Sequence, residues 1–131
     1  MLDHIGLEVK NIAKAKAFYT KALKPLGFGV QMEFGPKETG GAGTYVGIGA
    51  EGMPFFWVQK TKKGKTGSRT HVAFGAANRK AVKAFYTAAI KAGGKDNGKP
   101  GLRPDYHPNY YAAFVRDPDG NNIEAVCHKP E

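Results

Sequence analysis

The chain has 131 residues and a hydrophobic fraction of 41%, which suit one compact domain with a core of ordinary size. It contains no apolar run of the ~18 residues that a membrane span needs and no signal segment at Met1, so we expect a cytoplasmic protein with no membrane partner. The net charge of +9 is scattered, with Lys62, Lys63 and Lys65 in a predicted loop, and no aromatic-and-basic motif accompanies it, so nucleic acid is not an expected partner.

The chain repeats itself at an offset of 67 residues. Residues 16–24 (KAFYTKALK) and 83–91 (KAFYTAAIK) are identical at seven of nine positions. Each copy of such a repeat must be one supersecondary unit that buries its apolar face against another unit. The sequence therefore predicts a single domain over residues 1–131 that is built of two modules, residues 1–66 and 67–131.

The first module begins with a predicted half-buried strand, because apolar residues alternate with polar or small ones from His4 to Val9. Asn11 then offers an N-cap, and apolar residues at helical spacing predict a helix that ends at Pro25. Glycine-rich turns separate three further extended stretches, at about residues 28–34, 43–49 and 54–60.

The second module repeats this order from His71, with a strand, an N-cap at Asn78 and a helix closed by a glycine pair. After it we predict a loop rich in proline and tyrosine at 99–109, a strand at about 110–116, a tight turn (DPDG) at 117–120 and a last strand at 122–128. Each module thus reads βαβββ, and the fold class is α+β. A helix covers only one face of each sheet, so the other face needs a partner, which the second copy supplies.

Side chains alternate across a strand, so the sequence assigns residues to the sheet face opposite the helix. Four inward positions related by the same repeat offset hold His4, His71, Trp57 and Glu124. Two imidazoles and one carboxylate suit Fe, Mn, Ni, Co or Zn, with coordination positions left open for substrate or water. His4, His71 and Glu124 are therefore the candidate metal ligands. The alternative is a pocket without metal, in which Glu124 hydrogen-bonds His71 and the Trp57 indole stacks on a ligand.

Several of these segments together resemble the vicinal oxygen chelate superfamily, which includes glyoxalase I, extradiol dioxygenases, fosfomycin-resistance thiol transferases and bleomycin-binding proteins. The similar segments span essentially the whole chain: LDHIG at 2–6, AFYTKAL in the first helix, HVAF at 71–74 and DPDGNNIE at 117–124. The resemblance implies curved mixed sheets that form a cup around one divalent metal ion, which chelates neighbouring oxygens of a small-molecule substrate. It matches His4, His71 and Glu124 to the family's ligands. It also implies a homodimer, since the module pair often comes from two chains.

The resemblance implies a metal-dependent lyase, isomerase or dioxygenase, although Trp57 stands where glyoxalase I has a glutamate. Chemistry of the dioxygenase type needs a base and a proton donor beside the metal. His107, Tyr106 and Tyr110 are the catalytic candidates, and Trp57 and Arg103 are the substrate-binding candidates, provided that segment 99–109 folds over the cup. The alternative function is a metal-free protein that sequesters a small molecule, of the bleomycin-resistance type.

Overall fold

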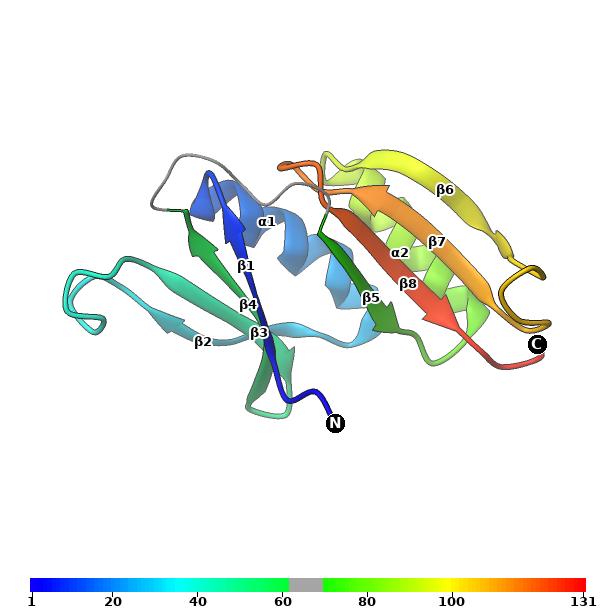
Figure 1. The fold of residues 1–131 in the computed structure, drawn as a ribbon, viewed down its shortest axis with the longest axis horizontal. Helices are drawn as coiled ribbons and strands as arrows, with labels where there is room; N and C mark the ends of the chain where they lie inside the picture. The colour runs from blue at the N-terminus through cyan, green and yellow to red at the C-terminus, as the bar shows by residue number, and fades with distance from the viewer. Residues whose placement is uncertain (62–69) are drawn as a thin grey trace.

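The structure is a computed structural model, and it describes residues 1–61 and 70–131. The predicted lysine loop with Lys62, Lys63 and Lys65 and the predicted module boundary at 66/67 lie outside the described residues. The first half holds β1 (Ile5–Val9), α1 (Ile12–Leu23), the 3₁₀ helix η1 (Lys24–Leu26), β2 (Gly29–Phe34), β3 (Tyr45–Ala50) and β4 (Met53–Lys60). The second half holds β5 (His71–Gly75), α2 (Arg79–Lys91), β6 (Lys95–Leu102), β7 (Tyr111–Arg116) and β8 (Asn122–Cys127) (Figure 1).

The strands form two four-stranded sheets with the same topology. The first sheet has the order β1-β4-β3-β2, and the second sheet has the order β5-β8-β7-β6. In each sheet the first strand along the chain, β1 or β5, lies at the edge and runs parallel to its neighbour, and the other pairs are antiparallel. The predicted fold, α+β with two βαβββ modules whose mixed sheets form an open cup, is confirmed.

Local signals in the sequence set the helix ends. The Asn11 side chain accepts a hydrogen bond from the Lys14 N–H at 3.0 Å, and the Asn78 side chain accepts one from the Ala81 N–H at 2.8 Å. Each bond satisfies one N–H that the first helical turn leaves free. Helix α1 ends at Leu23, because Pro25 lacks the N–H that would continue it and falls in η1. No helix in the described parts of the chain is long and apolar enough to cross a membrane.

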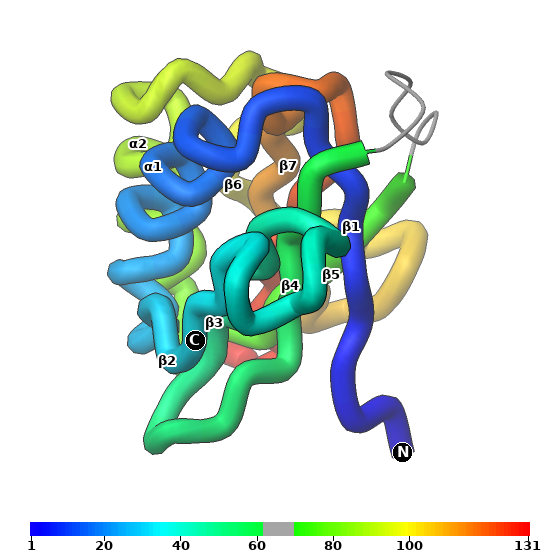
Figure 2. The backbone as a smooth tube through the Cα atoms, turned by 90° about the vertical axis from the view of Figure 1, so that its left-hand side faces the viewer, coloured from blue at the N-terminus to red at the C-terminus, as the bar shows by residue number. Residues whose placement is uncertain are grey.

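The helices cover one face of the sheets and also pack against each other. Helix α1 contacts β4, helix α2 contacts β6, β7 and β8, and α1 contacts α2. Figure 2 shows both helices on one side of the molecule and β1 on the other. The buried core between these layers includes Phe18, Tyr19, Phe56 and Phe85, all at most 1% exposed. The helices therefore hold the two modules together.

The free faces of the sheets, opposite the helices, differ from the sequence expectation. We expected the second module to cover the free face of the first. Instead both free faces look to the same side of the chain (Figures 1 and 2), because the modules join through their helices. The side chains of His4 and His71 are accordingly 60% and 49% exposed. Residues 1–61 and 70–131 of a single chain leave both free faces open.

Strand β6 differs from the sequence prediction. We predicted a loop from residue 99, but β6 continues to Leu102 and pairs with β7. Its sequence, KDNGKPGL, has neither alternation nor β-branched residues, so no local pattern indicates a strand. The pairing is irregular around Gly98 and Gly101, where the register shifts. Tertiary pairing with β7 therefore sets this strand.

Candidate functional site

The free face of the second sheet carries a carboxylate and an imidazole in direct contact. Glu124 lies on β8 and is 1% exposed, and His71 is the first residue of β5. His71 Nε2 lies 2.8 Å from Glu124 Oε2. An ionised carboxylate only accepts hydrogen bonds, so the imidazole nitrogen donates in this pair. The register places Ala73 beside Glu124, and its small side chain leaves space over the pair.

Tyr110 is the hydrogen-bond partner of the second oxygen of the same carboxylate. Its phenolic O–H donates a hydrogen bond to Glu124 Oε1. Burial, followed by the hydrogen bond to Glu124 and the charge of that carboxylate, raises the pKa of Tyr110 to about 12. Both oxygens of the buried Glu124 are thus satisfied, as burial of a charged group requires. With this pKa Tyr110 acts as a proton-bearing donor at neutral pH and not as a base.

The turn between β6 and β7 brings together the three residues that we predicted as catalytic. The Arg103 N–H donates to the Tyr110 carbonyl at 2.7 Å, and the N–H groups of Tyr106 and His107 donate to the Arg103 carbonyl at 3.0 and 3.3 Å. The Tyr106 ring lies 5.2 Å from the Tyr110 ring, and the His107 ring lies 5.8 Å from His128. His128 in turn lies 5.1 Å from Tyr110. These rings form one cluster beside Glu124.

Phe114, which was not among the predicted site residues, contacts both Arg103 and His71. The Arg103 guanidinium carbon lies 5.4 Å from the centre of the Phe114 ring, and the His71 ring lies 6.3 Å from it. Alternation along β7 could have found it, since Ala113 and Val115 on either side are fully buried on the helix side.

The first sheet carries His4 and Trp57 on its free face. His4 precedes β1, and its Nδ1 lies 2.7 Å from Asp3 Oδ1. The Trp57 indole stacks on Phe34 with ring centres 5.9 Å apart and planes 10° apart. A Cβ at Gly47 would lie 2.8 Å from the indole, so glycine lets this ring lie flat on β3. A shallow cavity of about 380 Å³ over these rings is lined by His4, Gly6, Phe34, Tyr45, Trp57 and Gln59.

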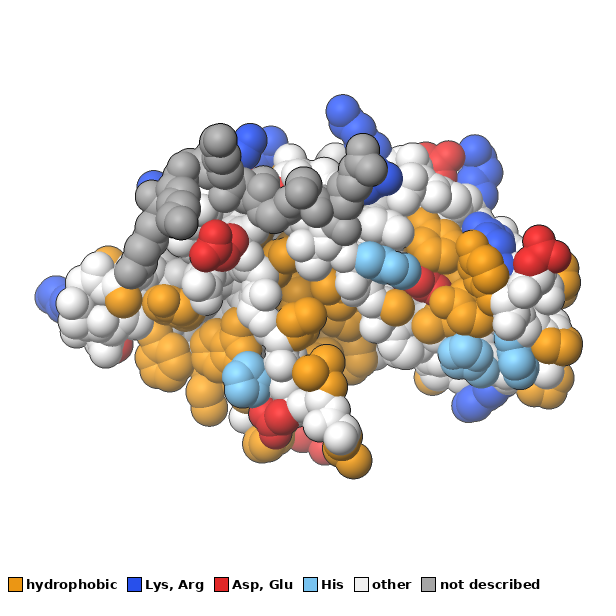
Figure 3. Space-filling view, in the orientation of Figure 1, with side chains coloured by type: hydrophobic (Ala, Val, Ile, Leu, Met, Phe, Trp, Pro, Cys, Tyr) orange, Lys and Arg blue, Asp and Glu red, His pale blue; other side chains and the backbone are white. Residues whose placement is uncertain are grey.

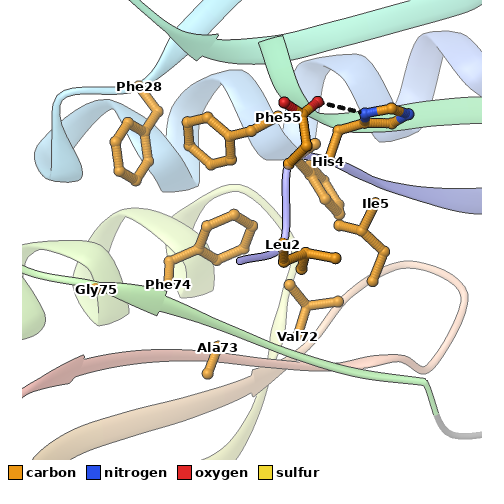
Figure 4. Close-up of a pocket in the computed structure, with 11 residues that line it drawn as sticks. Leu2, His4, Ile5, Phe28, Phe55, Val72, Ala73, Phe74 and Gly75 are labelled. Atoms are coloured by element: carbon orange, nitrogen blue, oxygen red, sulfur yellow. Dashed lines mark hydrogen bonds and ion pairs between the residues drawn. The ribbon is translucent and has the colours of Figure 1, made fainter. Parts of the chain in front are cut away.

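A second cavity, of about 220 Å³, lies where the N-terminal segment meets β5. Figure 4 shows the rings of Phe28, Phe55 and Phe74 turned toward one another in it, with His4 at its margin, bonded to Asp3. The space-filling view of the free faces shows hydrophobic and histidine side chains over both sheets (Figure 3). This side of the molecule is therefore more apolar than a net charge of +9 suggests.

The three predicted metal ligands do not meet within one chain. The structure brings His71 and Glu124 into contact but leaves His4 on the other sheet. Among residues 1–61 and 70–131, no three His, Cys, Asp or Glu side chains lie close enough to hold a metal ion together. The repeat offset correctly predicted equivalent positions, since Gly6 pairs with Trp57 as Ala73 pairs with Glu124.

Solved structures similar to this chain carry the same fold. A glyoxalase/bleomycin resistance protein from Albidiferax ferrireducens T118 is 25% identical with a TM-score of 0.75, over 97% of this chain and 98% of that one. A glyoxalase/bleomycin resistance protein/dioxygenase family enzyme from Burkholderia phytofirmans PsJN is 18% identical with a TM-score of 0.71, over 98% of both chains. A glyoxalase I mutant from Zea mays is 22% identical with a TM-score of 0.72, over 95% of this chain and 46% of that one.

A search of curated proteins found no significant match. The family model for the Glyoxalase/Bleomycin resistance protein/Dioxygenase superfamily matches residues 1–125, nearly the whole chain. This match agrees with the paired βαβββ topology and with the placement of His71 and Glu124 on the free face of the second sheet. The chain belongs to the Glyoxalase/Bleomycin resistance protein/Dioxygenase superfamily.

Proposed function

We propose that this protein is a divalent-metal-dependent enzyme that acts on a small molecule with two neighbouring oxygens. The observation that carries the proposal is the contact of His71 with the buried carboxylate of Glu124, at 2.8 Å on an open sheet face. His4, the residue related to His71 by the repeat, supplies the third ligand. Two imidazoles and a carboxylate are a donor set for Fe, Mn, Ni, Co or Zn.

The residues present fit one half of such a site. His71 and Glu124 already point at one another, and Tyr110 holds the remaining carboxylate oxygen. Binding of a metal ion by both residues would replace the His71–Glu124 hydrogen bond, since Nε2 cannot donate a hydrogen and ligate a cation at once. A bound divalent ion would polarise the substrate oxygens and stabilise the negative charge that develops on them.

A homodimer completes the site in this proposal. Two copies related by a two-fold axis can place His4 of one chain opposite His71 and Glu124 of the other, and symmetry gives two such sites. The separation of His4 from the pair within one chain supports this arrangement. Exposed apolar side chains on β2, Met32 at 42% and Phe34 at 40%, give the first sheet a surface that a second copy can bury.

Residues around the pair have defined roles in the proposal. Trp57 stacks on the substrate, Arg103 binds it, and Tyr110 keeps Glu124 oriented through its O–H. His107 and Tyr106, on the turn above Glu124, exchange protons with the substrate. Proton exchange by these two side chains suits an isomerase, lyase or dioxygenase, because such reactions need a base near the reacting atoms.

Metal titration of the purified protein tests the proposal. We expect about one equivalent of Fe, Mn, Ni, Co or Zn per chain with a dissociation constant below ~10 μM. His71→Gln should abolish this binding, because it removes a ligand. His128→Gln, which changes a histidine directly after β8 that is not a proposed ligand, should bind like the wild type. Less than a tenth of an equivalent bound by the wild type under saturating metal contradicts the proposal.

A metal-free binding protein is the second candidate function. The hydrogen bond between His71 and Glu124 and the flat Trp57 surface favour it, because both are complete without an ion. In that case Glu124→Ala keeps small-molecule affinity within about tenfold, or ~1.4 kcal/mol. A complete loss of small-molecule binding in Glu124→Ala would favour the metal site instead.

A further inference from the structure

We propose that Arg103 is a built recognition site for a carboxylate group of the substrate, so that the ligand is a small organic acid that also carries the two neighbouring oxygens. This inference rests on the proposed function, because it places the acid group relative to the His71–Glu124 pair. It adds the chemical class of the ligand, which neither the family nor the metal ligands specify.

The Arg103 guanidinium is held in one position on the free face. Its Nη2 donates to the Lys99 carbonyl at 2.7 Å, and its guanidinium carbon lies 5.4 Å from the centre of the Phe114 ring. The backbone of Arg103 is fixed too, since its N–H donates to the Tyr110 carbonyl at 2.7 Å. An arginine anchored in this way loses little side-chain freedom when a ligand binds.

Two glycines of β6 make room for this guanidinium. A Cβ at Gly98 would lie 2.8 Å from the Phe114 ring and 3.3 Å from Arg103 Nη2. A Cβ at Gly101 would lie 3.2 Å from Arg103 Nη1. The side chain therefore folds back over β6 into a space that larger residues would fill. These glycines account for part of the irregular pairing of β6.

The positive charge of the Arg103 guanidinium is available to a ligand. Among the described residues, the acceptors of its guanidinium are backbone carbonyls, those of Lys99 and Leu102, and no carboxylate forms an ion pair with it. The neighbouring Lys99 differs, because its ammonium lies 3.1 Å from an Asp96 carboxylate oxygen. Arg103 presents five N–H groups in a plane, so donors remain for a planar anion.

The position of Arg103 fits an acid group at the end of the substrate away from the chelating oxygens. Arg103 and His71 both lie against the Phe114 ring, at 5.4 and 6.3 Å. A substrate laid across Phe114 therefore reaches the His71–Glu124 pair with one end and Arg103 with the other. The planar guanidinium can form two parallel N–H···O bonds with a carboxylate, and with Lys99 paired to Asp96 it matches the single negative charge of that group.

A matched pair of probes tests the inference. Both 3,4-dihydroxybenzoate and 3,4-dihydroxybenzamide carry two neighbouring hydroxyls, and they differ in the charge of the remote group. With metal-loaded protein at pH 7.5, we expect the acid to bind at least about tenfold more tightly than the amide. Arg103→Gln should bring this ratio to within about twofold of one, and Arg103→Lys should keep part of the preference. Lys80→Gln, an exposed position on α2, makes the same change in net charge and should leave the ratio unchanged.

Metal affinity measured on the same variants separates this inference from the proposed function. Arg103→Gln should bind metal within about twofold of the wild type, because Arg103 is not a ligand. A wild type that does not prefer the acid, or a preference that survives Arg103→Gln, overturns the inference while a normal metal titration leaves the metal site standing. A preference lost in Arg103→Gln in a protein that binds no metal supports the inference and overturns the metal site.

Discussion

Glu124 is the residue on which the candidate site depends, because a carboxylate that is 1% exposed needs a partner for each oxygen. His71 donates to one oxygen from β5, and Tyr110, the residue before β7, donates to the other. Two partners from different segments fix the direction in which the carboxylate points. Residues that orient a ligand in this way are commonly worth about 10- to 100-fold in metal affinity.

Tyr110→Phe should weaken metal binding about tenfold without abolishing it, since Glu124 keeps its charge but loses one of its two orienting hydrogen bonds. Calorimetric titration with Zn or Mn measures this change. Tyr86→Phe is the matched control, because Tyr86 lies on α2, on the helix side of the second sheet, and should bind metal like the wild type. A Tyr110→Phe variant with unchanged affinity would show that Tyr110 does not position Glu124.

Tyr19 and Asp117 form a second buried polar pair, which joins the first helix to the turn before β8. The Tyr19 O–H donates to Asp117 Oδ2 at 2.5 Å, and the backbone N–H groups of Asp119 and Asn121 donate to Asp117 Oδ1 at 2.9 and 2.8 Å. Burial, followed by the charge of Asp117, raises the pKa of Tyr19 well above its usual value. The pair therefore requires a protonated phenol.

The pH dependence of stability follows from this raised pKa. Above about pH 10 the Tyr19 phenol of the unfolded chain loses its proton while the folded chain keeps it, so the free energy of unfolding should fall as the pH rises. Tyr19→Phe should lower the free energy of unfolding by about 1–3 kcal/mol at neutral pH, because Asp117 loses a hydrogen-bond donor. Its free energy of unfolding should also fall less above pH 10 than that of the wild type. Urea unfolding at a series of pH values measures both effects.

Tyr106→Phe is the control for this experiment, because its side chain is 67% exposed and should leave the free energy of unfolding nearly unchanged at neutral pH. If the free energy of unfolding of Tyr19→Phe falls as steeply above pH 10 as that of the wild type, groups other than Tyr19 must cause the loss of stability at alkaline pH.

The elements show which parts of the structure a sequence can predict. Helices α1 and α2 were predictable because caps, apolar spacing and terminators are all local, and the DPDG turn was predictable for the same reason, with Gly120 N–H donating to the Asp117 carbonyl at 3.0 Å. Strand β6 was not predictable, because its sequence lacks the alternation typical of a strand and only its pairing with β7 determines where it lies. The Glu124–His71 contact followed from the alternation of side chains along the strands and from the repeat. The position of the Arg103 side chain, in contrast, depends on two glycines and Phe114, which only the folded β6–β7 hairpin brings together.

The β3–β4 hairpin provides a sharp test at the level of elements. Gly29 and Gly49 face each other across β2 and β3, yet a Cβ at Gly49 would lie 2.0 Å from the Met53 carbonyl oxygen, while a Cβ at Gly29 meets nothing within 4 Å. Gly49→Ala should therefore lower the free energy of unfolding by about 1–3 kcal/mol, because backbone must move to admit the methyl group. Chemical unfolding measures the difference.

Gly29→Ala makes the same chemical change on the partner strand and should stay within about 0.5 kcal/mol of the wild type, as surface substitutions usually do. Equal losses in the two variants would mean that the close approach at Gly49 does not constrain the hairpin.

At the scale of the whole molecule, the packing of α1 against α2 decides where the site can form. It turns the free faces of both sheets to the same side, so the two halves of the repeat cannot close over each other. His4 and His71 stay exposed as a result, at 60% and 49%. A second copy facing these sheets would bring the histidine of one module opposite the histidine and carboxylate of the other.

Mixing two defective variants tests this arrangement. His4→Gln and Glu124→Gln should each bind little metal alone, since every site in either homodimer lacks a ligand. In a mixed dimer, one site takes His4 from the Glu124→Gln chain and His71 with Glu124 from the His4→Gln chain, and this site is intact. Co-expression of the two chains in equal amounts should give about half mixed dimers and so metal at about a quarter of all sites.

Metal analysis of the dimer fraction measures the recovery. Co-expression of His71→Gln with Glu124→Gln is the control, since both changes fall on the same half-site and no intact site can form. Recovery no greater than in this control would mean that the ligands are not shared between chains.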